Sequence, residues 1–89
     1  MAKVVEFDKF KVIKASAKEM FYAFGSLGIC DNCNEVSREG YYIAVLNQWF
    51  CKKCFERFKS DAKWYPEDAQ IEERNFKHYA LCLGINVEQ

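Results

Sequence analysis

The chain has 89 residues with 13 basic and 13 acidic side chains, so its formal net charge is zero at neutral pH. This balance argues against the strongly basic face of a dedicated nucleic-acid-binding domain. Hydrophobic residues make up 51% of the chain, but a chain of this size buries only about 60% of its unfolded surface, so a further stabilising element is expected.

The first predicted unit is a strand followed by a helix, over residues 3–25. Apolar and charged residues alternate over residues 3–14, which is typical of extended structure, with a turn favoured at Asp8-Lys9.

Ser16 and Glu19 fit a capping box, in which the serine side chain accepts from a free backbone N–H and the glutamate reaches back. A short helix is therefore expected to begin there, run through Phe24 and end at Gly25. The side of this helix expected to be buried carries Ala17, Met20, Phe21 and Phe24.

Two identical cysteine pairs, Cys30-x-x-Cys33 and Cys51-x-x-Cys54, are separated by 17 residues. Each pair brings two sulfurs close enough to share one metal ion, and four thiolates make a closed tetrahedral site. This ligand set and spacing are typical of structural zinc, so one Zn²⁺ held by these four cysteines is predicted. Iron in a rubredoxin-like site and a dithiol redox pair are the alternatives.

The zinc core is predicted to span residues 30–64. The first cysteine pair is expected to form a tight knuckle, followed by a strand over Tyr41–Leu46. A turn at Asn47-Gln48 and a short return strand at Trp49-Phe50 complete the expected hairpin. A helix is then predicted to begin at Cys51 and to continue as far as Tyr65, on a stripe of apolar residues.

A final helix is predicted over residues 66–83, with Pro66 at its first position and Gly84 after its end. Its expected apolar face is formed by Ala69, Phe76, Tyr79, Ala80 and Leu83. His78 is expected to be partly buried and neutral, Cys82 is interpreted as a small apolar helix residue, and neither is assigned a functional role.

Residues 30–64 resemble treble-clef zinc fingers in the order of knuckle, hairpin and a second Cys-x-x-Cys that opens a helix. The spacing, with Asn32 before the second cysteine, is similar to that of the GATA-type finger. The resemblance implies that Cys30, Cys33, Cys51 and Cys54 bind a single zinc ion. GATA-type fingers read DNA with an arginine-rich hairpin and a basic tail, whereas here five acidic and only two basic residues follow Tyr65.

The predicted fold is therefore α+β: one domain over residues 1–89, with a treble-clef-like zinc core, an N-terminal strand–helix and a C-terminal helix. The first twenty residues lack the continuous apolar stretch of a secretory signal, and no apolar run approaches the roughly 20 residues of a membrane span. A cytoplasmic protein that does not enter a membrane is expected.

The leading functional hypothesis is a protein-interaction module stabilised by structural zinc, with another protein as its partner. The alternative is a DNA- or RNA-binding regulator that uses the lysine-rich zinc helix, including Lys52, Lys53 and Arg57, or the hairpin. An enzyme is not expected, because four thiolate ligands leave no open metal position for a water molecule. No small-molecule substrate is inferred.

Overall fold

A computed structural model describes residues 2–85. It contains a four-stranded antiparallel sheet in the strand order β1-β2-β3-β4. The strands are β1 (Lys3–Phe7), β2 (Phe10–Ser16), β3 (Glu39–Ile43) and β4 (Gln48–Cys51). The helices are α1 (Ala17–Phe24), α2 (Lys52–Asp61), the 3-10 turn η1 (Pro66–Asp68) and α3 (Ala69–Cys82). The small α+β architecture predicted from the sequence is confirmed.

The N-terminal unit contains the predicted turn and helix, but the predicted single strand is a pair of antiparallel strands. β1 and β2 form a hairpin with Phe7 opposite Phe10, and Asp8 takes the left-handed conformation at its turn, with a φ of 51°. Both hydrogen bonds of the capping box between Ser16 and Glu19 are present at the start of α1. Gly25 ends this helix with a φ of 74°, a conformation that glycine adopts without steric cost.

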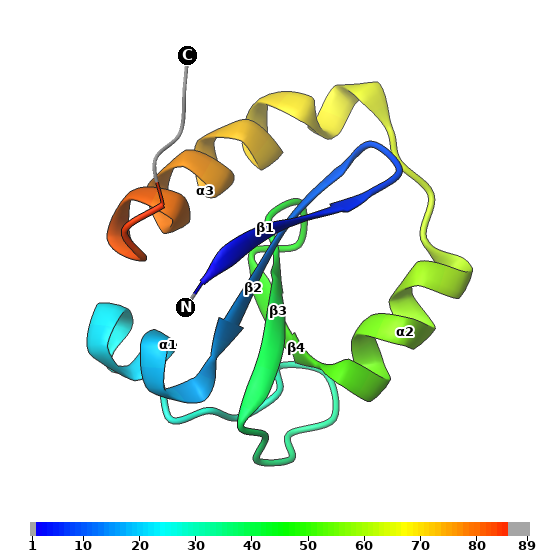
Figure 1. Cartoon of the computed structure of the whole chain (residues 1–89). Helices are drawn as coiled ribbons and strands as arrows, with labels where there is room; N and C mark the ends of the chain where they lie inside the picture. Colours follow the sequence, from blue (N-terminus) through cyan, green and yellow to red (C-terminus); the bar gives the residue numbers. More distant parts are fainter. Residues whose placement is uncertain (1, 86–89) are drawn as a thin grey trace.

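The sheet is covered on both faces. In Figure 1, α1 and α3 lie on one side of the strands and α2 on the other, in agreement with the two separate core clusters that these helices form with the sheet. Neighbouring residues therefore enter opposite cores: Tyr42 stacks on Tyr79 of α3 with ring centroids 3.7 Å apart, while Tyr41 stacks on Phe55 of α2 at 4.2 Å. Both tyrosines of β3 therefore pack in the interior of the protein, one on each side of the sheet.

The predicted hairpin is correct in kind but displaced by several residues. β3 ends at Ile43 instead of continuing to Leu46, and the turn occupies residues 44–47. The side chain of Asn47 accepts a 2.6 Å hydrogen bond from the hydroxyl of Tyr42, which ties the end of the turn back to β3. β4 then begins at Gln48, which the sequence had placed in the turn.

The helix predicted from Cys51 to Tyr65 is too long. α2 ends at Asp61, and Ala62 has extended backbone angles of −73° and 143°. Trp64 lies beyond this end and contacts Glu72 of α3. The last helix is confirmed apart from its first turn, because residues 66–68 form a 3-10 turn before α3 begins.

Two predictions of burial are wrong. Phe21 is 53% exposed, because α1 packs on the sheet through Met20 and Phe24 and has no second covered side. His78 is exposed, because α3 faces the sheet through Phe76 and Ala80, and position 78 lies about 200° around the helix from position 76.

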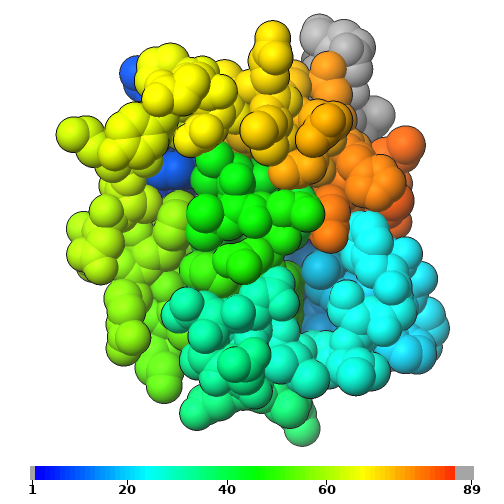
Figure 2. Space-filling model, turned by 180° about the vertical axis from the view of Figure 1, so that it is seen from behind, coloured from blue at the N-terminus to red at the C-terminus, as the bar shows by residue number. Residues whose placement is uncertain are grey.

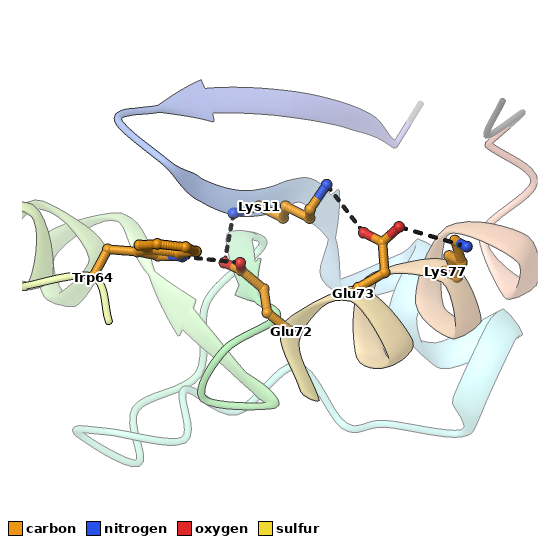
Figure 3. A network of polar contacts seen from close by, with 5 residues as sticks. All are labelled: Lys11, Trp64, Glu72, Glu73 and Lys77. Atoms are coloured by element: carbon orange, nitrogen blue, oxygen red, sulfur yellow. Dashed lines mark hydrogen bonds and ion pairs between the residues drawn. The ribbon is translucent and has the colours of Figure 1, made fainter. Parts of the chain in front are cut away.

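Glu72 is a buried carboxylate that the sequence analysis did not single out. It is 1% exposed and accepts hydrogen bonds from the backbone N–H of Lys11 at 2.9 Å and the indole N–H of Trp64 at 3.1 Å. Figure 3 shows how these contacts join β2, the α2–α3 connection and α3, next to ion pairs from Glu73 to Lys11 and Lys77. Glu72, Phe76 and Ala80 follow one another at intervals of four residues, which places them on the same face of α3. This spacing is the sequence signal that could have predicted the burial of Glu72.

Candidate metal centre

The four predicted cysteines come together in one cluster. Their Sγ atoms all lie within 4.8 Å of one another, and those of Cys33 and Cys51 are 3.8 Å apart. A tetrahedral ion with metal–sulfur bonds of about 2.3 Å would require sulfur–sulfur distances of about 3.8 Å. A disulfide needs about 2.05 Å, so the cluster has the dimensions of a metal site and not of a disulfide.

The first two sulfurs are placed by a tight turn, the knuckle of residues 30–33. The N–H of Asn34 donates to the carbonyl of Cys30 at 2.9 Å, and the N–H of Asn32 points at the Cys30 sulfur at 3.4 Å. Asn34 has a φ of 65°, a left-handed conformation that asparagine tolerates better than most residues. The turn therefore closes around Cys30 and directs a backbone donor toward its sulfur.

The other two sulfurs come from the junction of β4 and α2. Cys51 is the last residue of β4 and the N-cap of α2, and Cys54 lies in the first turn of the helix. The first N–H groups of a helix have no partners within it, and the helix dipole is positive at this end. Both features favour negatively charged sulfur at these positions.

The cluster is largely shielded from solvent. Cys30, Cys51 and Cys54 are buried and Cys33 is half-buried, within the core cluster on the α2 side of the sheet. Burial raises the pKa of the Cys30 thiol, but the backbone N–H groups of Cys33, Cys51 and Asn32 outweigh it and lower that pKa to about 6. These N–H groups therefore favour the thiolate form of Cys30, which is the form that binds a metal ion.

A reciprocal contact fixes the knuckle to the sheet. The N–H of Asp31 donates to the carbonyl of Trp49 at 2.9 Å, and the N–H of Trp49 donates to Asp31 Oδ2 at 2.8 Å. Trp49 is itself held by an indole hydrogen bond to the carbonyl of Ala15 at 3.0 Å. Because Trp49 is two residues before Cys51, these bonds set the position of the first cysteine pair relative to the second.

The arrangement can bind one metal ion with four sulfur ligands. Four sulfurs fill the coordination shell of a tetrahedral ion, so no position is open to water or another ligand. His78 is not part of this group: it lies on α3, which packs on the opposite face of the sheet. Cys82 is exposed on the same helix, with its sulfur 3.9 Å from His78 Nε2. Neither residue joins the cluster.

Within residues 2–85 no helix is long and apolar enough to cross a membrane. Comparison of the chain with protein-family models, with curated proteins and with solved structures gives no match. The functional conclusion therefore rests on the cysteine cluster and on the surfaces around it: the chain has a four-cysteine site suited to a metal ion.

Proposed function

We propose that this chain is a zinc protein whose single Zn²⁺, bound by Cys30, Cys33, Cys51 and Cys54, stabilises a treble-clef-like core that serves as a protein-interaction module. The observation that carries the zinc assignment is the four-sulfur cluster with tetrahedral dimensions. The order of knuckle, β3–β4 hairpin and a second pair at the start of α2 supports the treble-clef-like assignment.

The role of the ion in this proposal is structural. Four thiolates occupy every position of a tetrahedral zinc, so no water molecule is activated and no enzymatic activity is proposed. Metal binding to a site of this kind contributes on the order of 10 kcal/mol at neutral pH, which is comparable to the whole stability of a small domain.

Protein interaction is favoured by a concentration of exposed apolar side chains on α1 and the loop that follows it. Of the ten large apolar side chains that residues 2–85 expose, five fall within residues 21–36, which we call the apolar segment. They are Phe21, Tyr22, Leu27, Ile29 and Val36. Tyr22 and Leu27 are each 75% exposed and Val36 is 80% exposed. Phe21 packs on Tyr22, and Ile29 pairs with Val36, so some of these side chains are neighbours in space as well as in sequence. Contiguous exposed apolar patches mark binding surfaces, whereas isolated exposed apolar residues are common.

Site-specific photo-crosslinking inside cells tests this assignment. A photoreactive residue at Val36 is expected to form a covalent adduct with a partner protein. The same residue at Lys63, which is exposed after the end of α2, is expected to give none. Equal yields at both positions, or adducts at neither, would argue against the apolar segment as an interface.

The nucleic-acid alternative has one supporting observation: Lys52, Lys53 and Arg57 are all exposed on α2. Glu56 interrupts them and forms an ion pair with Lys59 at 3.2 Å, which weakens the positive field of that face. Titration of the zinc-loaded protein with mixed-sequence DNA and RNA, followed by tryptophan fluorescence, separates the two functions. Saturable binding that weakens steeply with salt would favour the nucleic-acid alternative.

A further inference from the structure

A cavity of about 260 Å³ lies beside the zinc knuckle, on the face of the sheet opposite α2. It is enclosed by the loop after α1, the β3–β4 hairpin and α3, and Figure 2 shows the hollow where these segments meet. Pockets for drug-sized ligands usually measure roughly 300–1,000 Å³. The cavity is therefore large enough for one long side chain.

Aromatic rings form much of its wall. Tyr42, Trp49 and Tyr79 line the cavity, and the rings of Tyr42 and Tyr79 are stacked within 9° of parallel. The hydroxyl of Tyr42 is bound to Asn47 Oδ1, and the indole N–H of Trp49 is bound to the carbonyl of Ala15. Because these two polar groups are already paired, the parts of the rings that face the cavity are mainly apolar. Tyr42 and Trp49 are only 1% and 4% exposed, and Tyr79 is packed between Tyr42 and Phe24, so the rings offer apolar contact and not an open ring face.

Asp31 is the one charged residue among those that line the cavity. One carboxylate oxygen accepts from the N–H of Trp49, and within residues 2–85 no cationic side chain pairs with this carboxylate. Burial raises the pKa of Tyr79, and the negative charge of Asp31 adds to that effect. The carboxylate therefore makes the electrostatic potential at the aromatic wall more negative.

We propose that this cavity receives the side chain of an arginine or lysine from the protein partner. The guanidinium or ammonium group would pair with Asp31, and its aliphatic stem would lie against the aromatic wall. Leu27 and Ile29 line the cavity and also belong to the apolar segment, so one partner can cover both. The inference rests on the proposed interaction function and names the chemistry of the residue that the partner must supply.

Nuclear magnetic resonance titration of the zinc-loaded full chain tests the cavity directly, without a known partner. The probes are N-acetyl-arginine amide, N-acetyl-lysine amide and the neutral N-acetyl-norleucine amide. The two cationic probes are expected to produce saturable shifts of the backbone and indole signals of Trp49, with dissociation constants in roughly the millimolar range. The indole signal of Trp64 is the internal reference, because Trp64 packs on the other side of the sheet.

Two variants that each remove one negative charge test whether Asp31 is the carboxylate that binds the cationic probes. Asp31→Asn keeps an oxygen that can accept from the Trp49 N–H, and it is expected to weaken binding of the cationic probes about tenfold. Glu35→Gln removes a negative charge from an exposed residue of the same loop that does not line the cavity, and it is expected to leave binding unchanged. The zinc content of both variants must equal that of the unmodified chain.

Asn47→Asp provides a test that does not alter the knuckle. Aspartate retains the acceptor for Tyr42 and tolerates the left-handed backbone at this position, where φ is 56°. The added negative charge is expected to tighten binding of the cationic probes several-fold. Equal binding of the norleucine and arginine probes, or no response to either charge change, would overturn the proposal.

The crosslinking and titration experiments can fail independently, so the cavity proposal and the proposed interaction function are tested separately. If photo-crosslinking at Val36 captures a partner but the cationic probes do not shift Trp49, the interaction function stands and the cavity proposal fails. If the probes bind but no partner is crosslinked, the cavity recognises cationic side chains and the apolar segment is not the interface.

Discussion

Trp64 donates its indole N–H to the carboxylate of Glu72 at 3.1 Å, and the second oxygen of the same carboxylate takes the backbone N–H of Lys11. A buried charge is costly unless hydrogen bonds satisfy it. Here both oxygens have a donor, although neither donor is a cation. The contact holds the α2–α3 connection and β2 against α3.

Replacing Glu72 with alanine is expected to lower the free energy of unfolding by about 2–4 kcal/mol, because two buried N–H donors lose their acceptor. Urea denaturation followed by tryptophan fluorescence measures this change. Glu73→Ala is the matched control: it removes the neighbouring carboxylate, which is 44% exposed, and is expected to cost less than about 1 kcal/mol. Similar losses for the two variants would show that Glu72 has no special structural role.

Features that depend on neighbouring residues in the sequence could be predicted, and features that depend on distant ones could not. The Ser16–Glu19 cap, the stop at Gly25 and the cysteine knuckle arise from local backbone hydrogen bonding, and the structure contains them as expected. The end of α2 was missed because no glycine or proline marks it before Pro66, and the contact of Trp64 with Glu72 forms only in the folded chain.

The same distinction applies to the two faces of the sheet. Strand alternation places Tyr41 and Tyr42 on opposite faces, so in a sheet covered on one side only, one of the two rings would point outward. Instead α2 covers Tyr41 and α3 covers Tyr42, so both are packed. The cysteine cluster could be predicted from spacing alone, whereas the cavity could not, because Asp31 and Tyr79 approach each other only through tertiary packing.

Gly40 has no room for a side chain, which leads to a prediction about stability. A Cβ atom at this position of β3 would overlap the ring of Trp49, although the glycine backbone there is not left-handed. Gly40→Ala is therefore expected to destabilise the fold by about 1–3 kcal/mol through overpacking alone.

A double-mutant cycle with Trp49→Phe checks the cause of that loss. Phenylalanine lacks the second ring of the indole, so Gly40→Ala should cost less in the Trp49→Phe background. Part of the cost should remain, because the added Cβ would also lie 2.8 Å from the backbone oxygen of Phe50. Equal costs in the two backgrounds would show that Trp49 is not the obstacle.

The proposed metal site predicts both the zinc content of the purified protein and its dependence on zinc for stability. The purified chain is expected to carry one zinc ion, measured by elemental analysis, and to lose cooperative thermal unfolding when a strong chelator removes it.

Cys51→Ser should abolish both the zinc content and the cooperative transition, since Cys51 joins β4 to α2 within the cluster. Cys82→Ser is the matched control and should retain both, because Cys82 is exposed and outside the cluster. A melting temperature indifferent to the chelator would contradict a structural metal.

Thiol reactivity distinguishes the same two classes of cysteine in the unmodified chain. Of the five cysteines, only Cys82 is exposed, whereas the other four are buried or half-buried and clustered. Metal-bound thiolates in such a site are shielded from reagents, because their charge is shared with the ion and solvent has little access. Brief treatment of the zinc-loaded protein with iodoacetamide should therefore add one alkyl group, and peptide mapping should place it on Cys82. After chelation all five should react. Rapid modification of Cys30 or Cys54 while zinc is bound would show that the cluster does not hold the ion in the closed form proposed here.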